Sequence, residues 1–269
     1  MMRSLWTAAS GMIGQQTNLD VIANNLSNIN TTGYKTQAAN FKTLIYQNLQ
    51  KKSTTTTGEP KPVGAQVGLG TRVGAVSSDF TQGALFASNG EFDFAIQGVG
   101  FFMVRMPDGT TAYTRNGHFN VSITEDGITL ADSEGNPVLD VQGREISLPN
   151  TYRAAFIEVD QFGNLTYPDA NNNQQPIGVQ IGLAYFPNPG GLDKGSGSNY
   201  LLSEASGPAT IYTANDLRSV IKSGYLEGSN VQAADEMVNM IIAQRAYEMN
   251  SKAIIASDEM LQQANNLRQ

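Results

Sequence analysis

Apolar residues recur with a seven-residue period near the amino terminus. Two such series, three positions apart, run through residues 5–29, and seven of their eight members are apolar. This period is typical of a continuous amphipathic helix with a coiled-coil seam. The residues that follow, 30–33 (NTTG), predict the end of the helix, with Gly33 suited to a left-handed cap. The two series are Leu5, Met12, Leu19 and Leu26, and Ala8, Gln15, Ile22 and Ile29.

The carboxy-terminal segment predicts a second long helix. Ser229 and Gln232 match the S-x-x-Q capping box that opens a helix. Its apolar series are Ala246, Ala253, Met260 and Leu267, and Ile242, Met249 and Ala256. Bulky residues widen both helical faces, namely Trp6 and Ile13 on the first and Tyr247, Ile254 and Leu261 on the second. A two-helix seam cannot cover faces this wide, so we expect neighbouring subunits to complete them. Packing of both helices on a globular core of the same chain is the alternative.

Turn signals dominate the chain between the helices. Asp108-Gly109, Asn116-Gly117, Asp126-Gly127, Gly135-Asn136 and Gly143 recur at short spacings, separated by aromatic and β-branched runs. This rhythm is typical of antiparallel β structure. The sequence therefore predicts an α+β fold. Long N- and C-terminal helices form a coiled-coil-like α domain, and an antiparallel all-β domain is inserted between them.

The same patterns suggest domain boundaries. Residues 1–35 plus 225–269 would form a discontinuous helical core domain that mediates polymerisation, and residues 76–224 the outer β domain. Residues 36–75 would be an extended connecting segment, interrupted by the Thr/Pro-rich stretch KKSTTTTGEPKPVG. Prolines and consecutive threonines oppose a helix there. Composition alone also fits a flexible linker.

Composition excludes several classes of site. The chain has no cysteine and one histidine, so a disulfide framework, a thiolate metal site and a His-rich metal cluster are all ruled out. The net charge of −7 argues against nucleic acid as a main partner. No apolar run is long enough for membrane insertion, and the start of the chain lacks the pattern of a cleaved signal peptide.

The sequence gives only weak signals for catalytic or ligand-binding residues. The glycine-rich GLGTRVG and QGVGFF do not open a predicted helix, so they do not fit a phosphate-binding loop. His118 follows a turn and is expected at the surface. Carboxylates such as Glu91, Asp93, Glu125 and Asp126 leave a glycosidase-like pair open, because sequence does not give their separation. We expect no catalytic residue, no cofactor and no metal.

Three separated motifs resemble the bacterial flagellar rod and hook protein family, and distal-rod members match best. The motifs are SLWTAASGM through QQTNLDVIANNLSNINTTGYK, FDFAIQGVGFFMV with YTRNGHF, and GYLEGSNVQAADEMVNMIIAQRAYEMNSKAI. The resemblance implies a non-enzymatic structural subunit that self-assembles into a helical tube, transmits motor torque to the hook and forms part of the export channel. It also implies that the Thr/Pro-rich segment braces adjacent subunits. Alternatives are another rod or hook subunit of this family, or a secreted β-domain glycan-binding protein with helical oligomerisation tails.

The resemblance also implies partners and a location. The partners are further copies of the chain, proximal rod and hook proteins, the flagellar type III export gate and the bushing rings around the rod. The location is the flagellar basal body, crossing the envelope outside the cytoplasmic membrane after export without a cleaved signal peptide. Phe41 and Ile45 in FKTLI resemble an export-gate motif, with a one-turn spacing that would place both side chains on one helical face.

Asparagines are unfavourable within a helix, because their side chains compete with helical hydrogen bonds. Their presence in the first helix therefore suggests that they bond to another part of the protein. We expect Asn24, Asn25 and Asn28 to bond to neighbouring subunits; fraying toward Gly33 is the alternative. The complete predicted polymer interface comprises Leu5, Trp6, Met12, Ile13, Leu19, Ile22, Asn24, Asn25, Leu26, Asn28, Ile29, Ile242, Ala246, Met249, Ala253, Ile254, Met260 and Leu261.

Overall fold

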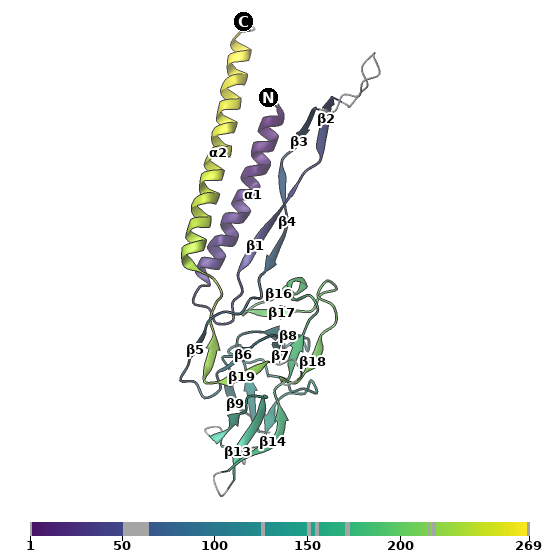
Figure 1. Cartoon of the computed structure of the whole chain (residues 1–269), viewed down its shortest axis with the longest axis vertical. Helices are drawn as coiled ribbons and strands as arrows, with labels where there is room; N and C mark the ends of the chain where they lie inside the picture. The colour runs from purple at the N-terminus through teal and green to yellow at the C-terminus, as the bar shows by residue number, and fades with distance from the viewer. Residues whose placement is uncertain are drawn as a thin grey trace. The chain divides into compact units, whose positions relative to one another are not determined.

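The chain forms two compact units in a computed structural model (Figure 1). Unit 1 holds Met1–Ser27, Gln37–Ser78 and Gln232–Gln269, and unit 2 holds Asn28–Thr36 and Asp79–Val231. The domain boundaries expected from sequence stay predictions, because compactness within one chain does not establish independent folding. The structure describes residues 2–50, 65–124, 127–149, 152–153, 156–169, 173–214, 216 and 219–267. Residues 51–64, the centre of the Thr/Pro-rich segment, lie outside the described residues.

Unit 1 combines two long helices with a β ribbon. Helix α1 (Met2–Ser27) packs beside helix α2 (Ala233–Asn266). Strand β1 (Gln37–Thr43) pairs antiparallel with β4 (Thr71–Ser78), and both lie against α1. Strands β2 (Tyr46–Gln50) and β3 (Ala65–Gly68) form a second antiparallel pair beyond them (Figure 1). The connecting segment is thus largely strand where it is described.

The predicted coiled-coil-like α domain is wrong, so the predicted fold class fits only in part. Helix α1 faces α2 on one side and the ribbon on another, and glycines permit both approaches. A Cβ built on Gly14 would lie 3.1 Å from the Phe41 ring of β1, and one built on Gly11 would lie 2.8 Å from the Asn250 side chain of α2. Neither glycine belongs to the two apolar series predicted from sequence, so these close approaches do not follow the predicted seam. Helix α1 therefore packs on two different elements of unit 1, α2 and the ribbon, instead of forming a coiled-coil seam with α2 alone.

The structure also corrects the predicted start of the second helix and the predicted end of the first. Helix α2 begins at Ala233 with Gln232 as its N-cap, and no side chain caps it. The Ser229 hydroxyl instead accepts a hydrogen bond from the Val231 amide at 3.3 Å. Helix α1 ends at Ser27, so Gly33 adopts its left-handed conformation (φ +69°) beyond the helix rather than at its cap.

Unit 2 is built almost entirely from antiparallel strands. Its largest sheet has the order β16-β17-β8-β7-β15-β18, and two three-stranded sheets have the orders β11-β10-β9 and β12-β13-β14. Two strand pairs, β19-β6 and β20-β5, complete it. A short 3-10 turn, η2, spans Pro189–Gly191. The strands are β5 (Leu85–Ala87), β6 (Phe94–Gln97), β7 (Phe101–Arg105), β8 (Thr111–Thr114), β9 (Asn120–Thr124), β10 (Gly127–Ala131), β11 (Ser147–Leu148), β12 (Glu158–Val159), β13 (Asn164–Pro168), β14 (Gln174–Gln180), β15 (Leu183–Tyr185), β16 (Asp193–Lys194), β17 (Asn199–Leu201), β18 (Thr210–Tyr212), β19 (Val220–Ser223) and β20 (Tyr225–Glu227).

The core of unit 2 lies on both faces of β7. Successive side chains of a strand point to opposite faces. Accordingly, Phe102 and Val104 join one buried apolar cluster, whereas Phe101 and Met103 join another with Phe186 and Tyr200. Burial on both faces explains why this stretch reads as an unbroken apolar run. The sequence-based expectation of antiparallel β structure between the helices is confirmed.

Candidate functional site

The predicted interface residues fall into three groups by exposure. Trp6, Ile13, Asn24, Ile242, Met249, Ala253 and Met260 are exposed in the single chain. Leu5, Met12, Leu19, Leu26, Asn28, Ile29, Ala246, Ile254 and Leu261 are partly buried, and Ile22 and Asn25 are buried. Their role between subunits stays a prediction, but the exposed group supplies an apolar surface that the chain itself does not cover.

Asn25 forms hydrogen bonds within unit 1. Its amide nitrogen donates to the Gln37 carbonyl at 2.8 Å, and its amide oxygen accepts from the Gln37 amide at 2.9 Å. The same nitrogen lies 3.3 Å from the buried Glu236 carboxylate of α2. One fully buried side chain thus joins the end of α1 to the first residue of β1 and to the first turn of α2.

The export motif lies on strand and loop in the folded chain. Phe41 belongs to β1 and packs over Gly14, and Ile45 follows the strand with 82% of its surface exposed. The one-turn helical spacing assumed from sequence is therefore wrong for the folded state. A role in export stays a prediction.

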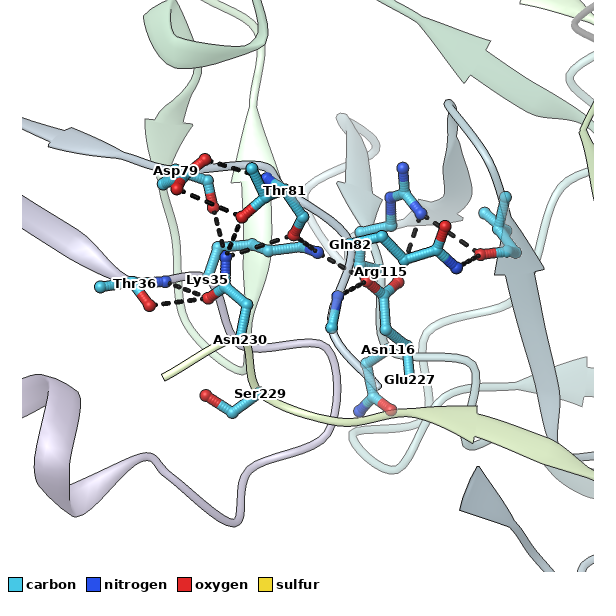
Figure 2. Close-up of polar contacts among 12 residues, drawn as sticks. Lys35, Thr36, Asp79, Thr81, Gln82, Arg115, Asn116, Glu227, Ser229 and Asn230 are labelled. Atoms are coloured by element: carbon cyan, nitrogen blue, oxygen red, sulfur yellow. Dashed lines mark hydrogen bonds and ion pairs between the residues drawn. The ribbon is translucent and has the colours of Figure 1, made fainter. Parts of the chain in front are cut away.

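Unit 2 holds a buried ion-pair network around Glu227 (Figure 2). The Lys35 ammonium donates to one Glu227 carboxylate oxygen at 2.6 Å, and Arg115 donates to the other at 3.2 Å. All three side chains are at least 96% buried. Two cations thus share one carboxylate away from water.

Backbone groups supply further hydrogen bonds to these charged side chains. Lys35 also donates to the Thr81 carbonyl at 2.8 Å, and Arg115 donates to the Gly98 carbonyl at 2.8 Å. The Gly83 amide donates to Glu227 at 3.0 Å. Buried charges are tolerated only where such partners replace their hydration.

Residues flanking Lys35 bond to the chain segments that carry Arg115 and Glu227. The amide and hydroxyl of Thr36 both donate to the Asn230 side-chain oxygen at 2.7 Å (Figure 2). The Thr32 hydroxyl donates to the Asn116 side-chain oxygen at 2.9 Å. Between them, Gly33 donates to the Glu227 carbonyl at 2.8 Å. A Cβ on Gly33 would lie 2.5 Å from the Asn116 nitrogen, so only glycine fits.

Burial shapes the electrostatics of the network. It lowers the pKa of Lys35 and of Arg115, because desolvation disfavours the charged forms, and Glu227 opposes the shift in both. Burial also raises the pKa of the Tyr200 hydroxyl. A buried lysine with a lowered pKa is a common sign of catalysis. Here the ammonium is fully covered and bonded to Glu227 and Thr81, so the arrangement fits a structural joint.

His118 forms a second polar pair at the surface of unit 2. Its Nδ1 lies 2.6 Å from the Asp93 carboxylate, whose other oxygen contacts the Ser88 hydroxyl. The carboxylate stands between serine and imidazole, so the histidine is not placed to activate the serine. Glu125 and Asp126 lie outside the described residues.

Among the residues that the structure describes, no group of three or more acidic or histidine side chains is arranged to hold a metal ion. Nor does any described helix have the length and apolar character needed to cross a membrane.

Sequence reasoning missed the network residues, although each lies in a motif quoted for the family resemblance. Lys35 ends NTTGYK, Arg115 is the third residue of YTRNGHF, and Glu227 lies in GYLEGSN. Lys35 and Glu227 are 192 residues apart, so no local periodicity connects them. The available signal was a charged residue within two positions of a glycine in all three motifs.

Comparison with sequence families finds three matching regions. Residues 5–35 match the family described as flagella basal body rod protein, and residues 95–167 match the flagellar hook protein FlgE/F/G D1 domain. Residues 222–267 match the flagellar basal body rod FlgEFG protein C-terminal family. Lys35, Arg115 and Glu227 each fall in a different one of these regions.

Full-length relatives agree with this assignment. The chain is 44% identical to the flagellar basal-body rod protein FlgG of Borreliella burgdorferi over 272 residues, covering 100% of this chain and 99% of the relative. It is 38% identical to FlgG of Bacillus subtilis, with both chains fully covered. The flagellar hook-basal body complex protein FlhP of the same bacterium is 29% identical, also with both chains fully covered. The higher identity favours the FlgG type.

Proposed function

The chain belongs to the FlgG family of flagellar basal-body rod proteins, and we propose that it is the structural subunit of the distal rod. In this role copies of the chain assemble into a helical tube that carries torque to the hook and surrounds part of the export channel. The full-length match to FlgG relatives supports the rod assignment. It removes the reason to consider a secreted glycan-binding protein.

The observation that carries self-assembly is the uncovered apolar face of α2. Ile242 and Met249 are 61% and 64% exposed, and Val238, Ile241 and Ile255 are also more than half exposed. Several exposed apolar side chains along one helix are the kind of surface that a protein partner covers. Each such side chain buried between subunits contributes roughly 1.5–3 kcal/mol. Many copies of this contact can offset the entropy lost on association.

Charge introduced into this face should prevent assembly. We expect Met249→Glu to abolish tubes in electron micrographs of concentrated protein, because burial of an unpaired carboxylate is strongly unfavourable. Gln244→Glu, an exposed polar position on the same helix, is the matched control and should assemble like the unmodified chain. Tubes formed equally well by Met249→Glu would remove α2 from the interface.

Assembly into the basal body implies contacts with other flagellar components. We propose proximal rod and hook proteins at the two ends of the tube, bushing rings around it and the type III export gate before assembly. The corresponding location is the basal body outside the cytoplasmic membrane, reached by export without a cleaved signal peptide. We propose no catalytic activity, because the role is structural and the buried Lys35 is inaccessible to a substrate.

Phe41 and Ile45 are our candidates for recognition by the export gate. Both side chains are more than 40% exposed even in the folded chain, so the gate can reach them without prior unfolding of unit 1. We expect Ile45→Ala to reduce secretion several-fold without lowering the thermal midpoint of purified protein, because its side chain makes little packing contact. Phe41→Ala should also reduce secretion but cost some stability through its contact with α1. Normal secretion of both variants, measured in culture medium, would exclude the motif.

A further inference from the structure

Unit 2 has a small apolar pocket over the Arg115 end of the ion-pair network. Its volume is 210 Å³, and Phe101 and Phe186 form buried walls. Val99 and Tyr185 line it as well, and both are exposed. Sites for drug-sized ligands usually measure about 300–1,000 Å³. The pocket is therefore sized for one or two side chains of a protein rather than for a cofactor.

Arg115 gives this pocket an electrostatic preference. The guanidinium lies 5.4 Å from the centre of the Phe101 ring and also lines the pocket. Its charge is incompletely balanced, because Glu227 is shared with Lys35. The Arg115 Nε–H group, moreover, has no hydrogen-bond partner among the described residues. A buried donor without a partner is unfavourable, and a carboxylate is the partner that suits a guanidinium best.

We propose that this pocket receives an aspartate or glutamate side chain from a second copy of the chain. The carboxylate would approach Arg115, and the methylenes behind it would contact the aromatic walls. Charge complementarity selects this occupant, since each copy carries 24 acidic against 17 basic residues. The inference rests on the proposed self-assembly.

The neighbouring surface supports a contact between copies. Tyr185 belongs to β15 and pairs edge-to-face with Tyr212 of β18, with ring centres 6.4 Å apart. Strand β18 is the last strand of its sheet among the described residues, and Ile211 and Tyr212 are exposed on it. An exposed edge strand with apolar side chains is a surface that a second chain can cover.

Val99 allows the carboxylate preference to be tested without assembly. It follows Gly98, whose carbonyl accepts the Arg115 hydrogen bond. Val99→Glu places a carboxylate at the pocket mouth, and Val99→Gln is its neutral isostere. We expect the glutamate variant to unfold about 3 °C or more above the glutamine variant at pH 7. The difference should vanish near pH 3, where the carboxyl is protonated. Equal midpoints at pH 7 would overturn the preference.

Occupancy by a second copy is tested by filling the pocket. Val99→Trp should raise the concentration needed for tube formation by about tenfold or more. Ile123→Trp, at an exposed apolar position outside the pocket, is the matched control. It should change the concentration needed for tube formation by less than about twofold. Equal assembly of the two variants would overturn the contact. If the unmodified chain forms no tubes, the proposed function fails, whereas the thermal comparison still decides the carboxylate preference.

Discussion

Replacing Glu227 by glutamine is expected to lower the free energy of unfolding by about 3–5 kcal/mol, because two buried cations lose the carboxylate that they share. In a domain of this size the thermal midpoint should fall by about 10 °C. Differential scanning calorimetry of the full chain gives the midpoint, and denaturant titration gives the free energy. Amide exchange at Gly33, which donates to the Glu227 carbonyl, should also accelerate.

Glu145→Gln is the matched control for this experiment. Glu145 is half exposed and lies 3.8 Å from Arg105, so its ion pair is screened by water. Exposed pairs contribute about 0–1 kcal/mol. Equal losses in the two variants would show that the Glu227 network does not stabilise unit 2 as argued. A second variant, Lys35→Met, removes one cation and leaves Glu227 with Arg115 and the Gly83 amide as described partners.

Asn25→Leu should destabilise unit 1 before any subunit contact is made. The substitution removes the partners of the Gln37 amide and carbonyl and one neighbour of Glu236. Each buried polar group left without a partner costs about 1–3 kcal/mol, so we expect a total loss of about 2–4 kcal/mol. The measurement is hydrogen exchange at the Gln37 amide in dilute monomer, together with the yield of tubes.

The outcome separates two uses of Asn25. If Gln37 exchanges faster and tubes are lost, the residue acts by joining α1 to β1 within the chain. If exchange is unchanged and only tubes are lost, it acts between subunits, as the sequence suggested. Asn48→Leu, at an exposed position of β2, is the matched control and should alter neither measurement.

The sequence pattern predicted the helices and turns, because their formation depends mainly on residues that are close together in the chain. The seven-residue period identified both long helices, because an amphipathic stripe needs only the turn of one helix to form. The turn glycines Gly109, Gly135 and Gly143 all have positive φ, which few other residues adopt without strain. The antiparallel character of the middle region followed from the spacing of such turns.

Only the tertiary structure decided how these elements meet. The seven-residue period of α1 does not state what packs against the helix, and the ribbon of β1 and β4 contacts it at positions such as Gly14 that lie outside the predicted apolar series. Asn25 meets Glu236 across 211 residues of chain, and Lys35 meets Glu227 across 192. A single charged residue leaves no periodic pattern in the sequence. Whether its burial stabilises the fold depends on the partners that folding brings to it from distant parts of the chain. The sequence by itself therefore determined the elements and the family, whereas the polar contacts that secure them depend on the folded chain.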